Sequence, residues 1–312
     1  MRRIIPPRRP EGIRWLRSDG KPNFGDRIHR KPGDAQLLAT RPVYTVTRTT
    51  SILEAMELIA EKNIRALPVS HPATKLLEGM TTVMDYVNYL GGGELYNIVV
   101  KRYGGNAYKA LNDEKVESIM NPNPYYVTVS DRLEKILEIM VTRNVGVLPV
   151  VKPDGKIYGI ITEHDLVKHL VEKHVGKTVR EVMTSNVISI NSSATIMEAA
   201  KTMIKYSVRR LPVIEDDGSI WGLITAKHIV KFFGSHDAFR FTESPLLEDM
   251  MKAPVKLVGT RSYVTVEPDV DVGDAATLMI REGVGCLLVV SEGRVVGIVT
   301  ERDVLYGLAT TG

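Results

Sequence analysis

A Thr-x-x-Asp sequence recurs in this chain, each time directly after a short apolar run that begins with glycine. Threonine followed three residues later by an acid is close to a capping box, which satisfies free N–H groups at a helix start. The same groups suit a nucleoside, because a helix N-terminus attracts anions and a neighbouring carboxylate can accept both ribose hydroxyls. The two roles are compatible, so the motif alone leaves both open. Three segments end in this motif and a fourth ends in histidine: Gly79–Asp85, Gly159–Asp165, Gly297–Asp303 and Gly222–His228.

The four copies differ in the polar groups that they offer to a ligand. His164 and Arg302 stand between the threonine and the aspartate of their copies, where a cation would favour a phosphate. In the third copy His228 replaces the aspartate, so we expect a weak or empty site there. The preceding Arg209 and Arg210 could hold phosphate or be surface cations. The candidate nucleotide-binding residues are Thr82, Asp85, Thr162, His164, Asp165, Thr225, Thr300, Arg302 and Asp303.

Each copy occupies the same place in a longer repeat. A second strand lies upstream of it, written Leu-Pro-Val in three repeats and Leu-Leu-Val in the fourth. A stretch with apolar residues at i, i+3, i+4, i+7 and i+8 comes before that strand, and such a stripe buries one face of a helix. Each repeat therefore predicts strand, helix, strand, strand and helix, and the self-similarity indicates a repeat architecture. The expected first strands are Val43–Val46, Tyr126–Val129, Val187–Ile190 and Val264–Val266.

Two of the repeats carry insertions. The step from Asp165 to His228 is the shortest between neighbouring motif ends, and the longer steps contain additional segments near 91–115 and 233–260. The glycine run at 91–93 is too short for a phosphate-binding loop, so it predicts a helix stop and a flexible connection. The first insertion contains Lys101, Arg102 and Lys109, which would extend a basic surface or cover the edge of a module.

Together these features resemble the CBS-domain family, over roughly Pro42–Leu308. The resemblance rests on the β-α-β-β-α order, the Leu-Pro-Val strand and the Gly-x-x-Thr-x-x-Asp ending. It implies an α/β (α+β) fold of four CBS repeats paired into two Bateman modules, at 34–176 and 177–312, after an extended basic arm at 1–33. It also implies that AMP, ADP, ATP or S-adenosylmethionine binds in the clefts of the modules. The organisation is similar to that of stand-alone archaeal CBS proteins.

The composition is that of a soluble globular protein. The chain has 312 residues, of which 44% are hydrophobic and 25% are charged. No apolar stretch approaches the length of a membrane-spanning helix, so we expect no membrane span, and the chain start lacks an apolar signal core. The single cysteine, Cys286, falls in an expected buried strand, which favours a core role. These features predict a cytoplasmic protein.

The arm at 1–33 is strongly basic. It holds ten Lys or Arg and three acids, a net +7, which leaves −3 for the remainder of a chain of net +4. With five prolines and no periodicity, this arm is expected to be disordered in isolation. It is either a solvated leader or an arm that folds on RNA, with the ribosome as the expected target. The candidate RNA-binding residues are Arg2, Arg3, Arg8, Arg9, Arg14, Trp15, Arg17, Lys21, Arg27, Arg30 and Lys31.

The sequence contains no nucleophile–base pair, metal-ligand cluster or cofactor fingerprint at a recognisable spacing. We therefore expect a protein that is not an enzyme and needs no catalytic cofactor, and the family resemblance implies that it acts as a regulatory protein by binding an adenosine nucleotide. In the first hypothesis its basic arm docks on RNA, and it silences translation. In the alternative it senses adenylates as the regulatory subunit of a partner protein or enzyme, without RNA. The family resemblance also implies a homodimer through module faces.

Overall fold

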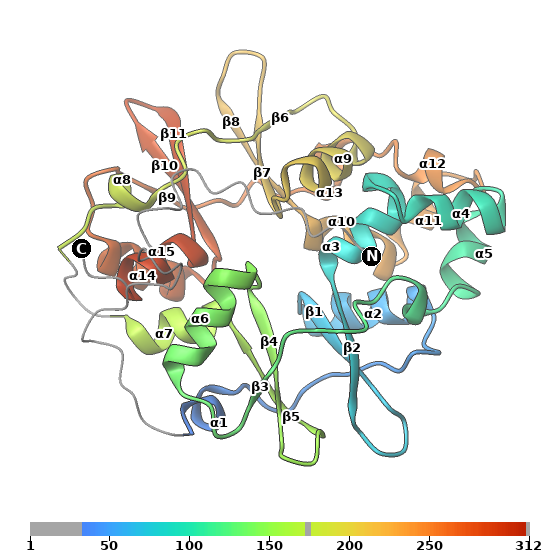
Figure 1. The fold of residues 1–312 in the computed structure, drawn as a ribbon. Helices are drawn as coiled ribbons and strands as arrows, with labels where there is room; N and C mark the ends of the chain where they lie inside the picture. Colours follow the sequence, from blue (N-terminus) through green and yellow to red (C-terminus); the bar gives the residue numbers. More distant parts are fainter. Residues whose placement is uncertain (1–32, 172–175, 310–312) are drawn as a thin grey trace. The chain divides into compact units, whose positions relative to one another are not determined.

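The computed structural model describes residues 33–171 and 176–309, which form two compact units (Figure 1). Of the described residues, unit 1 comprises those up to Val43, those within Tyr125–Val187 and those from Tyr263 on. Unit 2 comprises Tyr44–Pro124 and Ile188–Ser262. Each unit has a hydrophobic core of its own.

Unit 1 is built from the second and fourth repeats. Each repeat contributes a three-stranded sheet, in which the last two strands are antiparallel and the short first strand runs parallel to the middle one. Helix α15 packs against α7 and α14, so helices of both repeats share one core (Figure 1). The elements are α1 (Asp34–Leu38), β3 (Val127–Thr128), α6 (Leu133–Arg143), β4 (Val147–Val151), β5 (Ile157–Thr162), α7 (Glu163–Leu170), α8 (Val179–Val182), β9 (Thr265–Val266), α14 (Val272–Glu282), β10 (Cys286–Ser291), β11 (Arg294–Thr300) and α15 (Glu301–Ala309).

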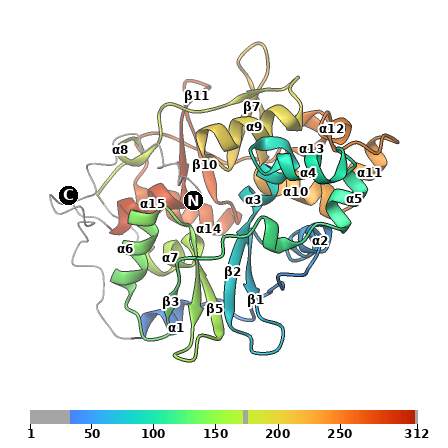
Figure 2. The ribbon, with the colours of Figure 1, turned by 45° about the vertical axis from the view of Figure 1, so that its right-hand side comes forward.

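Unit 2 is built from the first and third repeats. Helix α10 of repeat 3 packs against α2 and α3 of repeat 1, and α9 packs against a π-helical turn, η1 (Figure 2). The elements of repeat 1 are α2 (Ile52–Lys62), β1 (Ala66–Ser70), β2 (Leu77–Thr82), α3 (Val83–Val87), η1 (Asn88–Gly92), α4 (Tyr96–Tyr103), α5 (Ala107–Asn112) and the 3-10 turn η2 (Val116–Ser118). Those of repeat 3 are β6 (Ile190–Asn191), α9 (Ile196–Tyr206), β7 (Arg210–Ile214), β8 (Ile220–Thr225), α10 (Ala226–Gly234), α11 (Asp237–Phe241), α12 (Leu247–Met250) and α13 (Val255–Val258).

The predicted order of strand, helix, strand, strand and helix is confirmed in repeats 2, 3 and 4, and in repeat 1 a single bridge takes the place of the first strand. Local sequence explains the helix ends: Ser51 and Thr195 begin α2 and α9 with complete capping boxes, and Asn63 and Asn144 end α2 and α6 in the left-handed conformation. The predicted first strands are shorter than expected. Three have two residues, and in repeat 1 only Val46 pairs, as a bridge to β1.

A segment from another repeat pairs with the last strand of every sheet. Each pairing joins the residue after the motif glycine to one linker residue, through two backbone hydrogen bonds of 2.8–3.2 Å. The segment before repeat 1 thus lies on repeat 2, and the segment before repeat 2 lies on repeat 1. Repeats 3 and 4 exchange their segments in the same way. The pairs are Thr40 with Ile160, Asn121 with Met80, Thr184 with Ile298 and Thr260 with Leu223.

The predicted modules, 34–176 and 177–312, do not coincide with the compact units, because each module contributes to both. Helix packing joins repeat 1 to repeat 3 and repeat 2 to repeat 4, and the linker segments join repeat 1 to 2 and repeat 3 to 4. The Bateman pairing therefore stays a prediction.

Both insertions lie in unit 2, where they meet. Ala107 N donates to Pro245 O at 2.8 Å, and Leu247 N donates to Gly105 O at 2.9 Å. The prediction of a flexible connection at the glycine run is wrong. Gly92 is buried against α9, and a Cβ there would lie 2.8 Å from Ala200 O. The run lacks side chains because helices pack closely across it.

Candidate functional site

The aspartate of each complete motif closes the first turn of the helix that follows the sheet. In repeat 2, Asp165 Oδ2 accepts from Thr162 N at 2.8 Å and from Thr162 Oγ1 at 2.7 Å. The same two bonds measure 2.9 and 3.0 Å at Asp85, and 2.8 and 2.7 Å at Asp303. Both bonds use one oxygen, which leaves Oδ1 outside the cap. Burial raises the pKa of the Asp303 carboxyl above its usual value, although the Thr300 hydrogen bonds oppose this.

The linker residue lies beside the motif, and in repeat 2 it touches the carboxylate. Thr40 Oγ1 donates to Asp165 Oδ1 at 3.0 Å. The next linker residue, Arg41, has its guanidinium 4.4 Å from the centre of the Tyr158 ring, and its Nη1 donates to the Tyr158 hydroxyl at 3.4 Å. A hydroxyl and a cation from the segment before repeat 1 therefore stand beside the motif of repeat 2.

The motif glycines exist because the linkers come so close. A Cβ at Gly159 would lie 2.6 Å from Ala39 Cβ, and a Cβ at Gly79 would lie 2.9 Å from Asn121 O. At Gly222 the Cβ would collide with the backbone of Thr260. The linker residues are not among the site residues predicted from the sequence. Their signal is a polar residue of fixed spacing before each first strand.

Repeat 3 has a different polar group at the aspartate position. Thr225 Oγ1 still accepts from His228 N at 3.2 Å, so the helix is capped. The His228 Nδ1 atom is buried and has no hydrogen-bond partner among the described residues. Burial, together with the charges of Lys227 and Lys231, lowers the pKa of this imidazole to about 4. At neutral pH the third motif therefore carries no charge at this position.

The two residues between the threonine and the aspartate of the motif make different contacts in the two units. In unit 1, Arg302 Nε donates to Glu163 Oε1 at 2.6 Å, and His164 Nδ1 lies 2.8 Å from Glu301 Oε1. Arg302 also contacts the side-chain oxygen of Asn144. The predicted phosphate cations, His164 and Arg302, thus already hold carboxylates of the opposite repeat. Their roles as phosphate ligands stay predictions, whereas their role in joining two repeats is observed.

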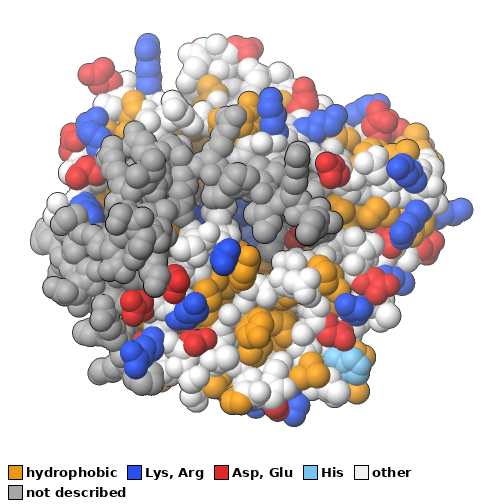
Figure 3. Space-filling model, in the orientation of Figure 1, with side chains coloured by type: hydrophobic (Ala, Val, Ile, Leu, Met, Phe, Trp, Pro, Cys, Tyr) orange, Lys and Arg blue, Asp and Glu red, His pale blue; other side chains and the backbone are white. Residues whose placement is uncertain are grey.

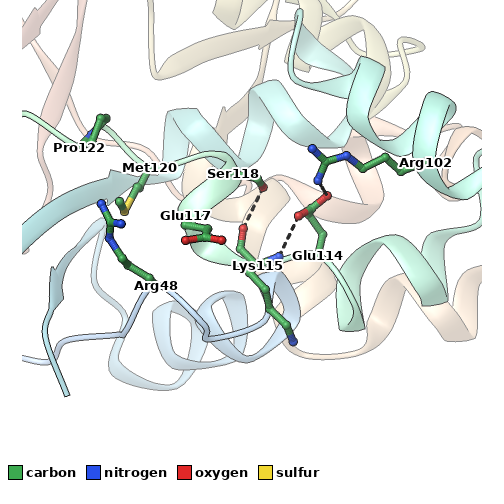
Figure 4. Close-up of a pocket in the computed structure, with 8 residues that line it drawn as sticks. All are labelled: Arg48, Arg102, Glu114, Lys115, Glu117, Ser118, Met120 and Pro122. Carbon is green, nitrogen blue, oxygen red and sulfur yellow. Dashed lines mark hydrogen bonds and ion pairs between the residues drawn. The ribbon is translucent and has the colours of Figure 1, made fainter. Parts of the chain in front are cut away.

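A separate cavity of about 370 Å³ lies in repeat 1 (Figure 4). Glu114 is buried in its wall, where Arg102 donates to it at 2.8 Å. The lining combines three cations with two carboxylates, and it contains no residue of a Thr-x-x-Asp motif. Because the charges nearly balance, the cavity does not indicate an anion site. The lining residues are Arg48, Arg102, Glu114, Lys115, Glu117, Ser118, Met120 and Pro122.

The predicted RNA-binding residues of the arm, from Arg2 to Lys31, lie outside the described residues. On the face shown in Figure 3, Lys and Arg side chains of the described residues are interspersed with Asp and Glu. Within 33–171 and 176–309 there is no group of three or more His, Cys, Asp or Glu arranged to hold a metal ion. Nor is any helix in that part of the chain long and apolar enough to cross a membrane. Cys286 is buried and forms no disulfide.

Known proteins share this arrangement. The family model of the CBS domain matches residues 35–92, 116–172, 179–235 and 249–310. An uncharacterized 33.4 kDa protein in the ribosomal RNA operon of Thermofilum pendens is 32% identical over 86% of this chain and 88% of its own length. Protein MJ1225 of Methanocaldococcus jannaschii, whose name describes a candidate archaeal homologue of g-AMPK, has a crystal structure that matches with a TM-score of 0.81. That match has 28% identity and covers 88% of this chain and 99% of the other.

A conserved protein from Pyrococcus horikoshii, which its name calls uncharacterized, shares the fold. Its TM-score is 0.54 at 19% identity, over 87% of this chain and 98% of the other.

Proposed function

Because the chain belongs to the CBS-domain family, we propose that its complete Thr-x-x-Asp motifs bind the ribose of an adenosine nucleotide. The contact of Thr40 with Asp165 carries the proposal. A hydroxyl group already donates to Asp165 Oδ1, at 3.0 Å, where a ribose hydroxyl could take its place. The other oxygen holds the helix cap, so the carboxylate is oriented before a ligand arrives.

Each site combines a motif with the linker of a neighbouring repeat. Thr162 and Asp165 form one site with Thr40, and Thr300 and Asp303 form another with Thr184. Thr82 and Asp85 form the third with Asn121. The exchange of linkers between repeats 1 and 2, and between 3 and 4, also supports pairing into the two predicted Bateman modules.

The repeat 3 site is weaker in this proposal. A neutral imidazole at His228 offers a single acceptor in place of two carboxylate oxygens. Thr225 remains as a hydroxyl beside it. The arginine after the linker residue, Arg261, lies over Trp221 with its guanidinium 5.7 Å from the ring, as Arg41 lies over Tyr158. These two arginines are further candidates for phosphate contact.

Replacing Asp165 or Asp303 with alanine tests the proposal by titration with AMP, ADP and ATP. A hydrogen bond to a charged group contributes roughly 1.5–3 kcal/mol, so each change should weaken its own site about 10- to 100-fold. Glu198→Ala is the matched control, because Glu198 closes the capping box of α9 outside the motifs. Unchanged affinity in Asp165→Ala and Asp303→Ala, or an equal loss in the control, would refute the ribose role.

The proposed ligand leads to a regulatory function. A CBS protein whose sites follow the adenylate pool would change its docking to a partner protein or enzyme as nucleotides bind. The similarity to MJ1225, which is itself named as a candidate g-AMPK homologue, supports this version of the function. A homodimer through module faces stays a prediction within it.

A second candidate function is RNA binding through the arm at 1–33, and it rests on a different observation. The relative from Thermofilum pendens is named for its position in a ribosomal RNA operon. Together with the net +7 of the arm, this supports docking on the ribosome and control of translation. The salt dependence of ribosome binding separates this candidate from the first.

A further inference from the structure

The helix starts that carry two of the proposed sites face each other within unit 1. Helices α7 and α15 pack together, and each begins one residue after the threonine of its motif. The first middle residue of each motif, Glu163 or Glu301, is paired with the second middle residue of the other, Arg302 or His164. The Glu163–Arg302 ion pair and the His164–Glu301 hydrogen bond are therefore reciprocal across the contact between repeats 2 and 4, and the second becomes an ion pair when His164 is protonated.

The two glutamates in these contacts are buried, so their partners must stay close. The Glu163 side chain is 2% exposed and that of Glu301 is 6% exposed. Gly146 makes room for Glu163, since a Cβ there would lie 2.6 Å from Glu163 Oε2. A buried carboxylate that loses its partner is strongly destabilised, so a movement of either helix start is opposed by the other.

Each pair lies inside the turn that would hold a ligand. Glu163 and His164 stand between Thr162 and Asp165, and the cap of that turn uses the same carboxylate that would bind ribose. A ligand that replaces the Thr40 hydroxyl at Asp165 acts on a turn that is bonded on its far side to repeat 4. The equivalent turn of repeat 4 is bonded to repeat 2 in the same manner.

Unit 2 provides an internal comparison. Val83 and Ala226 occupy the two buried positions that Glu163 and Glu301 occupy in unit 1. At the other two positions are Met84 and Lys227, and Lys227 Nζ donates to Asn63 O at 3.4 Å. Valine, alanine and methionine cannot form ion pairs, so the starts of α3 and α10 lack the reciprocal link.

We propose that the Glu163–Arg302 ion pair and the His164–Glu301 hydrogen bond couple the ligand sites of repeats 2 and 4, so that occupancy of one changes the affinity of the other. This inference rests on the proposed nucleotide function, and it adds a regulatory link that unit 2 does not have. Typical coupling between sites changes affinity about 5- to 150-fold, and the effect must be equal in both directions.

The experiment uses full-length protein with Asp85→Ala, which leaves the two sites of unit 1 and the weaker repeat 3 site. AMP, ADP and ATP are the probes in calorimetric titration. Adding Asp165→Ala or Asp303→Ala gives the intrinsic affinity of the remaining site. The coupling factor is the affinity with the other site filled, divided by this intrinsic value. We expect a factor of about 5 or more, and the same factor from either site.

The decisive variant gives unit 1 the four side chains that stand at the equivalent positions of the other unit: Glu163→Val, His164→Met, Glu301→Ala and Arg302→Lys. Three of the four changes introduce apolar side chains, and replacing buried ion pairs by apolar residues is often neutral for stability. Circular dichroism checks that the variant, which keeps a cation at position 302, is folded. We expect its coupling factor to fall to about 1, the value for independent sites. The control variant, Lys227→Met, changes an equivalent position in unit 2. It should leave the coupling factor of unit 1 unchanged.

Three results would overturn the inference, and they are distinguishable. Independent binding at the two sites of the Asp85→Ala protein refutes the coupling alone. An unchanged coupling factor in the folded four-residue variant shows that these side-chain contacts do not transmit the coupling. Absence of binding by all three nucleotides refutes the proposed function together with the coupling. If His164 and Arg302 only contacted phosphate, the four-residue variant would have lower intrinsic affinities and an unchanged coupling factor.

Discussion

At the scale of single residues, position 228 shows how one substitution changes a motif. The Thr225 hydroxyl still caps the helix, because it accepts from the backbone N–H of residue 228 whatever the side chain is. The side chain itself changes from a carboxylate with two acceptors to an imidazole whose Nδ1 is buried without a partner among the described residues. The fold of repeat 3 is thus retained, and its chemistry is altered.

His228 should make the protein less stable in acid. Burial lowers the pKa of its imidazole to about 4, from about 6.5 in the unfolded chain, with Lys227 and Lys231 adding to the effect. Between these values the unfolded state binds the proton, so stability is complete above pH 6.5 and falls as the pH drops towards 4. The full shift corresponds to roughly 3 kcal/mol. Urea unfolding from about pH 4 to 7 measures this slope.

The variant His228→Asn removes the titrating group, so its stability should depend less on pH over the same range. His71→Asn, in an exposed loop, is the control for a general effect of losing a histidine. If His228→Asn and the unmodified protein lost stability in parallel between pH 6.5 and 4, the imidazole would not be the cause.

At the scale of elements, the last strand of each sheet positions its site. The strand pairs with its antiparallel neighbour on one edge and with a linker from another repeat on the other. The motif glycine stands where that linker crosses, so the absence of a side chain brings a hydroxyl such as that of Thr40 to the carboxylate. One glycine therefore contributes both to folding and to the candidate site.

Gly159→Ala should loosen the linker at repeat 2. The new Cβ would lie 2.6 Å from Ala39 Cβ, and overpacking of this kind costs about 1–3 kcal/mol. Displacement of the linker also moves Thr40, so adenylate affinity at the repeat 2 site should change as well. Chemical unfolding and nucleotide titration measure the two effects. Gly104→Ala is the control, because no heavy atom lies within 4 Å of its Cβ position, which leaves only the backbone strain. Equal effects of both variants would contradict the linker contact.

At the scale of the whole molecule, the chain alternates between its two units. Repeats 1 and 3 build unit 2, and repeats 2 and 4 build unit 1, so each unit needs segments that are far apart in sequence. A cut between repeats 2 and 3 would therefore place the two halves of each unit on separate chains. In unit 1 the middle residues of the motifs are all polar or charged, whereas in unit 2 three of the four are apolar. This difference matches the pairing of repeat 2 with repeat 4 and of repeat 1 with repeat 3.

Removal of the arm at 1–33 tests the second candidate function. Phosphate contacts release counterions, so an RNA-binding arm predicts ribosome co-sedimentation that weakens steeply between about 50 and 200 mM salt. The truncated protein should lose this binding, and the assay should be repeated with and without AMP and ATP. Pelleting that persists without the arm would assign binding to another surface. If the full chain does not pellet with ribosomes, the remaining candidate function is adenylate-dependent docking to a partner protein.

The sequence by itself determined the repeat, its order of elements and the helix caps. These depend on short-range physics: the apolar stripe of Ile196 to Ile204 forms one helix face, and Thr162 and Asp165 are close because one turn of helix separates them. The carboxylate part of the candidate sites could therefore be predicted residue by residue.

Only the tertiary structure decided which repeats pack together and what surrounds each motif. Thr40 and Asp165 are 125 residues apart, and Glu163 and Arg302 are 139 apart, so no local pattern connects them. Arg302 was therefore predicted as a cation for phosphate, although its guanidinium holds a buried carboxylate. The glycine run at 91–93 was likewise interpreted as a flexible connection, because its neighbour α9 begins a hundred residues later. These contacts arise from long-range packing, because folding brings together residues that are far apart in the sequence.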